Sequence, residues 1–167
     1  MIRVVVDDLA FVPADAIIRP ANEQLDPVTP AMSRLDQQAG EKFAAQRRVQ
    51  IPLDIGAAVV TGGGDLTAKF VVHAVIQNRD TSAGAATVRR ALVSAWQRAS
   101  DWELAAIATP LVGVGAGQLS IEEAVSILTE TLKEHHARAR FPAEVQIVLE
   151  REGERETVQA AVARHPV

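Results

Sequence analysis

Short apolar runs alternate with amphipathic segments along almost the whole chain, and this alternation constrains the fold more than any other feature. Runs rich in valine, isoleucine and alanine predict strands at residues 2–6, 15–19, 56–61, 70–76, 104–110 and 144–149. Apolar residues at helical spacing predict helices at residues 30–48 and 83–100, from Ser120 onward, and at residues 154–165. We therefore expect a three-layer α/β/α fold, with a mixed central sheet of about six strands flanked by helices.

Local residues sharpen three of these predictions. Pro20 is expected to stop the strand at residues 15–19, because proline has no N–H group to donate. Residues 70–76 form a continuous apolar run around His73, which predicts a strand buried on both faces and a core histidine with satisfied hydrogen bonds. Ser120 followed three residues later by Glu123 is a capping box, which marks the start of a helix.

Composition indicates one globular domain over residues 1–167. A chain of 167 residues with 48% hydrophobic and 23% charged residues can bury a real core. Its net charge of −4 gives no support for free nucleic-acid binding, and the absence of cysteine excludes disulfides and thiolate zinc sites. We find no metal-ligand spacing among the four histidines, no membrane span and no signal peptide, and we expect a cytoplasmic protein without metal or cofactor.

A glycine-spaced loop between a predicted buried strand and a capped helix is the strongest candidate site. Alternating glycines let the backbone approach a ligand and turn its N–H groups inward, and the following helix N-terminus favours an anion. We prefer phosphate binding to the alternative of a merely tight turn, although the spacing matches neither G-x-G-x-x-G nor a P-loop. The residues of this loop are Val112, Gly113, Val114, Gly115, Ala116, Gly117 and Gln118.

Weaker candidates lie at other predicted strand ends. Asp8 follows the first strand, where a carboxylate is usually a solvated turn residue but can also accept a hydrogen bond from an amino group. Asn22 follows the second strand, where asparagine most often serves turn geometry but is also suited to a sugar hydroxyl. Glycines at residues 62–64 indicate a hairpin-type turn, and His135 and His136 are interpreted as structural residues at a helix end.

Taken in order, these segments resemble a macro domain, the ADP-ribose-binding module. Residues 15–22 read D-A-I-I-R-P-A-N, which is similar to the family's D-A-I-V-N-A-A-N. Residues 56–73 resemble the family's G-x-A-x-x-T/S-x-G segment and the strand L-P-A-K-[YF]-V-I-H that follows. Residues 110–124 resemble its phosphate loop and the following helix. The resemblance covers nearly the whole chain.

The resemblance implies a role for each candidate. Asp8 would accept a hydrogen bond from the adenine amino group, the Leu9 backbone would help to recognise the ring, and Leu149 would lie against the adenine face. Asn22, which follows Ala21, would contact the distal ribose, and the loop at residues 112–118 would surround the diphosphate. The implied partners are ADP-ribose or an ADP-ribosylated macromolecule.

Departures from the family pattern bear on catalysis. The hydrolytic branch has G-G-G-V-D-G after the asparagine, whereas residues 26–33 here read D-P-V-T-P-A-M-S and place Met32 near the catalytic aspartate's position. Arg19 replaces the first asparagine of the motif, while Asp26 and Asp36 are the nearest acids. In these features the chain resembles the histone-variant-like macro domains, which bind and do not cleave.

Three functions follow from this resemblance. The first is a binding module for ADP-ribose or a close relative. The second is a hydrolase that acts on ADP-ribosylated protein or nucleic acid, or on O-acetyl or 1″-phosphate derivatives of ADP-ribose, by substrate-assisted water attack with Asn22 as the positioning residue. The third is a degenerate scaffold whose pocket is closed by residues 26–31.

Overall fold

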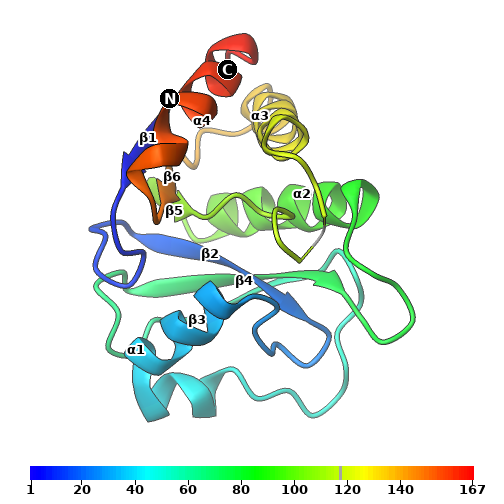
Figure 1. Ribbon diagram of the computed structural model, residues 1–167. Helices are drawn as coiled ribbons and strands as arrows, with labels where there is room; N and C mark the ends of the chain where they lie inside the picture. The colour runs from blue at the N-terminus through cyan, green and yellow to red at the C-terminus, as the bar shows by residue number, and fades with distance from the viewer. Residues whose placement is uncertain (117) are drawn as a thin grey trace.

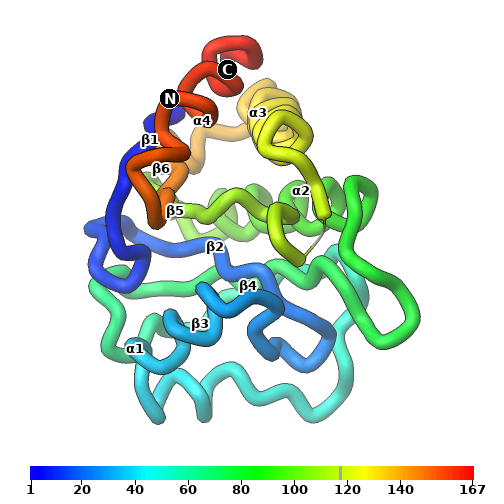
Figure 2. Tube along the Cα trace, viewed as in Figure 1, coloured from blue at the N-terminus to red at the C-terminus, as the bar shows by residue number. Residues whose placement is uncertain are grey.

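The central sheet is mixed, with one antiparallel strand at an edge. The computed structural model describes residues 1–116 and 118–167, and within them the strands are β1 (Ile2–Val6), β2 (Ala16–Asn22), β3 (Ala58–Gly62), β4 (Phe70–Gln77), β5 (Ala106–Thr109) and β6 (Glu144–Leu149). Their order is β1-β6-β5-β2-β4-β3, and β3 runs antiparallel to β4 while the other neighbours are parallel. The trace in Figure 2 shows β1 and β6, the first and last strands of the chain, side by side. The prediction of a mixed sheet of about six strands is confirmed.

Helices cover both faces of this sheet (Figure 1). The described helices are α1 (Pro30–Gln46), α2 (Ala85–Asp101), α3 (Ile121–His136) and α4 (Arg155–Arg164), with a short 3₁₀ turn, η1 (Glu152–Glu154), before α4. The larger core lies between the sheet and α2, α3 and α4, with Trp96 fully buried at its centre. A smaller core lies under α1, where Phe43 packs against Ile17 and Val71. The predicted three layers are therefore present.

The strand β2 continues past the proline that was expected to end it. The prediction of a stop at Pro20 is wrong, because β2 runs to Asn22 and Pro20 pairs with Ala74 of β4. On its other side β2 pairs with β5 only at Ala16 and Ile17. Beyond Ile17, β5 does not pair with that side of β2. The missing N–H of a proline therefore costs no hydrogen bond of the sheet there, and proline is tolerated as it is on an edge strand.

The helix α1 is interrupted where the sequence predicts a continuous helix. Gly40 has φ 86° and ψ −176°, far from helical values, and only glycine adopts such a backbone readily. The carbonyl of Ala39, displaced from the helical ladder, accepts a hydrogen bond from the Asp65 N–H at 2.9 Å. The turn that follows β3 therefore supports the break in α1, which spacing along the sequence alone does not reveal.

Other local predictions are confirmed. Ser120 caps α3: its hydroxyl accepts from the Glu123 N–H, and the Glu123 carboxylate accepts from the Ser120 N–H. The strand β4 is buried from Val71 to Ile76. His135 and His136 each donate from Nε2 to a carbonyl of the following loop, at 2.7 Å, which agrees with a structural role.

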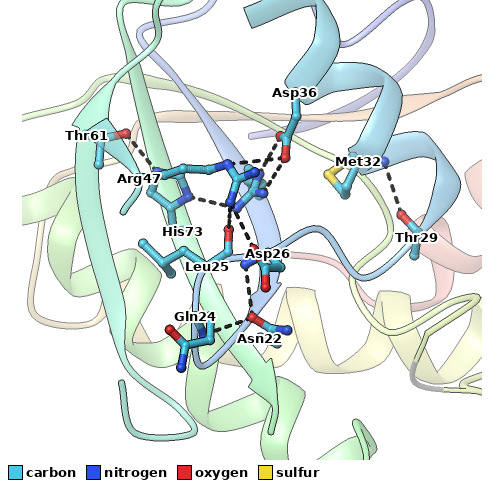
Figure 3. Close-up of polar contacts among 11 residues, drawn as sticks. Asn22, Gln24, Leu25, Asp26, Thr29, Met32, Asp36, Arg47, Thr61 and His73 are labelled. Atoms are coloured by element: carbon cyan, nitrogen blue, oxygen red, sulfur yellow. Dashed lines mark hydrogen bonds and ion pairs between the residues drawn. The ribbon is translucent and has the colours of Figure 1, made fainter. Parts of the chain in front are cut away.

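A buried ion pair attaches α1 to the sheet (Figure 3). Arg19 of β2 is fully buried, and its Nε and Nη2 atoms donate to the two carboxylate oxygens of Asp36, at 2.8 and 2.6 Å. Arg47, at the end of α1, lies 3.6 Å from the same carboxylate and also donates to the Leu25 carbonyl and the Asp26 carboxylate. The network thus joins β2, the segments of α1 before and after Gly40, and the loop that connects β2 to α1.

The ion pair determines the state of His73 on β4, which pairs with Arg19 in the sheet. Arg19 Nη1 lies 3.1 Å from His73 Nδ1, and because guanidinium only donates, Nδ1 must be the acceptor. Nε2 therefore carries the proton and donates to Thr61 Oγ1 at 2.8 Å, while the Thr61 hydroxyl donates to the Gly62 carbonyl. Burial, together with the charges of Arg19 and Arg47, lowers the pKa of His73 well below its ordinary value of 6.5. The predicted core histidine is confirmed.

Removing the carboxylate of the buried pair should destabilise the fold strongly. In an Asp36→Ala variant the Arg19 guanidinium is buried without its counter-ion, and we expect the free energy of unfolding to fall by about 3–5 kcal/mol. Denaturant unfolding measures this loss. Asp101→Ala is the control, because Asp101 forms a solvent-exposed pair with Arg98 and should have a small effect. Equal effects of the two substitutions would contradict the role given to Asp36.

The neutral state of His73 predicts that stability falls in acid. Above pH 6.5 neither the folded nor the unfolded chain protonates this histidine, whereas below it the unfolded chain takes up a proton that the folded chain does not. The free energy of unfolding should therefore decrease below about pH 6.5, with a contribution from His73 of up to ~1.4 kcal/mol per pH unit. Parallel unfolding series on wild type and His73→Gln isolate this term, because all other groups are shared; identical slopes would refute it.

Candidate functional site

A cleft runs along the carboxyl ends of the parallel strands, the edge at which open α/β sheets bind ligands. Two adjoining cavities of about 340 and 560 Å³ form it. They share residues of α1, of the loop after β5 and of the end of β6, namely Ala31, Met32, Arg34, Pro110, Val148 and Glu150. The two cavities are therefore parts of one cleft, whose size is in the range of sites for small ligands.

The smaller cavity contains the predicted Asp8 and Leu9, which follow β1. Oδ1 of Asp8 accepts a hydrogen bond from the Ala10 N–H at 2.9 Å, and the neighbouring Asp7 Oδ1 accepts from the Asp8 N–H at 2.7 Å. These bonds hold the turn, and no described group donates to the other carboxylate oxygen of Asp8, Oδ2. Leu35 and Val148 add apolar area to the same cavity, so it suits a flat ring that carries an amino group.

The larger cavity contains the glycine-spaced loop. Gly113, Val114, Gly115 and Ala116 line it, and Gly113 and Gly115 have φ values of +98° and +91°, which glycine adopts at little cost. In the described part of the chain, no group accepts a hydrogen bond from the N–H of Gly113, Gly115 or Ala116. Such backbone N–H groups are suited to phosphate oxygens. Gly117, also predicted for this site, lies outside the described residues.

The other residues that the sequence predicted for the site do not all line the part of the cleft expected for them. Leu149 lines the larger cavity, and not the smaller one that contains Asp8. Val112 is buried beside the loop, Gln118 is exposed with φ +56°, and neither lines the cleft.

The predicted Asn22 supports the loop that leads into α1. Its Oδ1 accepts hydrogen bonds from the N–H groups of Gln24 and Asp26, at 2.9 and 3.0 Å (Figure 3). Neither Asn22 nor the fully buried Ala21 is among the residues that line the two cavities. The loop itself reaches the cleft further on, through Val28 and Thr29, and the Thr29 hydroxyl caps α1 by accepting from the Met32 N–H.

Two acids that precede or belong to α1, Asp26 and Asp36, are engaged in ion pairs. Asp36 binds Arg19, and Asp26 binds Arg47, so both carboxylates belong to the network under α1. Neither lines the cleft, whereas Met32 does. On the α1 wall the cleft therefore presents the thioether of Met32, which cannot act as a general base.

Several cleft residues were not identified from the sequence. They are Thr29, Arg34, Gln38, Glu150, Arg151 and Glu154. These polar residues resemble ordinary exposed positions of a helix or loop, whereas Pro110 belongs to the segment that resembles the phosphate loop. Their common location depends on the order of the strands, which the sequence does not state.

Two further observations concern the described residues as a whole. None of their helices combines the length and apolar character that crossing a membrane requires. No cluster of three or more histidine, aspartate or glutamate side chains among them is arranged to hold a metal ion.

The family model of the macro domain matches residues 18–128, well over half of the chain. The chain therefore belongs to the macro domain family. Its fold is similar to that of a mutant Oceanobacillus iheyensis macrodomain with ADPR, with a TM-score of 0.81 and 21% identity over 96% of this chain and 91% of that chain. It is also similar to a Trypanosoma brucei macrodomain in complex with ADP, with a TM-score of 0.82 and 20% identity over 96% and 68%.

Sequence relatives differ from this chain in length. A protein of Aeropyrum pernix is 30% identical over 124 residues, which cover 74% of this chain and 66% of that protein. A protein of Mycobacterium tuberculosis is 21% identical over 128 residues, which cover 77% of this chain and 36% of that protein. The chain thus spans a little under two thirds of the first relative and about a third of the second.

The glycine loop should not tolerate a side chain at Gly113. A Cβ there would lie 2.5 Å from Leu119 Cδ1, and the positive φ is unfavourable for alanine, so Gly113→Ala should destabilise the protein by roughly 1–3 kcal/mol. Thermal unfolding tests this. Gly84→Ala is the matched control, because Gly84 has an extended φ of −162° and its Cβ would meet no described atom within 4 Å. Similar losses in both variants would refute the argument.

Proposed function

We propose that this chain is an ADP-ribose-binding module that holds its ligand without cleaving it. The proposal rests on one arrangement: a carboxylate, Asp8, at one end of the cleft, and at the other end backbone N–H groups of the glycine loop for which the described residues provide no acceptor. An adenine with its amino group and a diphosphate need these two kinds of partner. The solved macrodomains with ADPR and with ADP, which share this fold, support the same class of ligand.

In this proposal the adenine occupies the smaller cavity and the diphosphate the larger. Asp8 Oδ2 accepts from the adenine amino group, and the Leu9 backbone and the apolar Leu35 and Val148 surround the ring. The diphosphate lies against residues 113–116, and the distal ribose lies toward Val28 and Thr29, close to the turn that Asn22 supports. A leucine or valine wall provides area without ring stacking, so we expect lower affinity than an aromatic wall would give.

Binding is preferred to hydrolysis because no described carboxylate of α1 or its preceding loop lines the cleft. Asp26 and Asp36 are held by Arg47 and Arg19, and the resemblance to the family places Met32 or a neighbour at the position of the catalytic aspartate. A closed scaffold is disfavoured for a different reason. The segment at residues 26–31 borders an open cavity of about 560 Å³ through Val28, Thr29 and Pro30 and does not fill it.

The macromolecular ligand follows from the same chemistry. Free ADP-ribose and ADP-ribose attached to a protein or nucleic acid share the adenosine and diphosphate that the cleft is suited to hold. We propose an ADP-ribosylated macromolecule as the partner, bound through its ADP-ribosyl group.

Binding of ADP-ribose should depend on the Asp8 carboxylate. Asp8→Ala should weaken binding by about 1–3 kcal/mol, or roughly five- to 150-fold in Kd, because a charged hydrogen bond to the ligand is lost. Calorimetry on the purified protein measures this change. Asp101→Ala removes the same charge from a residue that lines neither cavity and controls for net charge. Absence of both heat and thermal shift with wild type at millimolar ADP-ribose would refute the proposed function.

Turnover separates the binding module from the hydrolase. Wild type incubated with mono-ADP-ribosylated protein, with ADP-ribosylated nucleic acid and with O-acetyl-ADP-ribose should release no ADP-ribose by chromatography. Release that is lost in Asn22→Ala would instead establish the hydrolase.

A further inference from the structure

An ion pair crosses the cleft where its two cavities meet. Nη2 of Arg34, on α1, donates to Oε1 of Glu150, the residue after β6, at 2.7 Å. Both residues line both cavities, yet their side chains keep 60% and 58% of their surface exposed, while Met32 and Val148 on the same walls are buried. The pair therefore lies at the rim and connects the α1 wall to the β6 wall.

The charges around the cleft make this pair relevant to an anionic ligand. Among the described residues that line the cavities, the acids Asp7, Asp8, Glu150 and Glu154 outnumber the cations, Arg34 and Arg151. The net charge of these side chains therefore opposes a phosphate-bearing ligand. The backbone N–H groups favour it, as does Arg151, for which the described residues show no ion pair, whereas Arg34 is held by Glu150. Arg34 lies at the junction between the Asp8 cavity and the glycine-loop cavity, which a ligand that spans both must pass.

Breaking the Arg34–Glu150 pair costs little free energy. An ion pair this exposed adds little net stability, because water screens it and two long side chains must be ordered. A phosphate group offers guanidinium a stronger alternative, since its oxygens accept two parallel, charge-assisted hydrogen bonds. Glu150 then returns to water, where its charge is fully solvated.

We propose that the Arg34–Glu150 pair is an exchangeable latch, in which a phosphate of the ligand replaces Glu150 as the partner of Arg34. Arg34 thereby selects phosphate-bearing nucleotides, and Glu150 lowers the affinity for every such anion by competing for the same guanidinium. This inference rests on the proposed function, because its ligand is the nucleotide held in the same cleft.

The latch predicts that substitutions of Arg34 and of Glu150 change the affinity for ADP-ribose in opposite directions. With ADP-ribose in calorimetry, Arg34→Gln should weaken binding about tenfold, because the guanidinium is lost. Glu150→Gln should tighten it roughly three- to tenfold, because a competing carboxylate is removed. Arg89→Gln and Glu130→Gln are the matched controls, since this pair joins α2 to α3 with similar exposure and lines neither cavity; both should leave Kd within about twofold.

Each outcome decides between the proposals. A purely structural pair would make both substitutions weaken binding alike, and that result, or no change in either variant, overturns the latch while ADP-ribose binding stands. If wild type does not bind ADP-ribose, the same variants are titrated with inorganic pyrophosphate. Pyrophosphate binding that Arg34→Gln abolishes and Glu150→Gln strengthens supports the latch without the proposed function, and no binding by any variant overturns both.

Discussion

The bidentate contact between Arg19 and Asp36 is the interaction on which the functional edge of this molecule depends. Arg19 is fully buried on β2, so its charge requires a counter-ion, and Asp36 on α1 supplies it through both oxygens. The contact places α1 over β2 and β4, and α1 is the wall that brings Met32, Arg34 and Leu35 to the cleft. A buried charge that fixes the position of a helix therefore also determines the shape of the cleft.

The same contact affects the chemistry available in the cleft. Asp36 is one of two acids close in sequence to the position of a catalytic aspartate, and its carboxylate faces Arg19 and Arg47 beneath the helix. The other acid, Asp26, pairs with Arg47 at the end of that helix. With both acids in the network, the α1 wall of the cleft carries Met32 and no carboxylate. The contact that holds α1 on the sheet therefore also keeps the Asp36 carboxylate away from the cleft.

Much of the fold could be predicted because local patterns decide it. The apolar run around His73 required a buried strand, and Ser120 with Glu123 required a helix start. The exceptions arose where a distant partner overrode a local preference. Pro20 continues β2 because β5 does not pair there, and Gly40 breaks α1 because Asp65, in the turn after β3, takes the carbonyl of Ala39.

The sequence by itself determined the alternation of strands and helices, the family, and a glycine loop, because these depend on residues close together in the chain. Gly113 and Gly115 need no distant partner to adopt positive φ. Only the tertiary structure decided which polar side chains meet. Arg34 and Glu150 are 116 residues apart and come together because the sheet order and the position of α1 bring the end of β6 to face that helix. That packing alone decides which acids line the cleft and which form ion pairs with the arginines at α1.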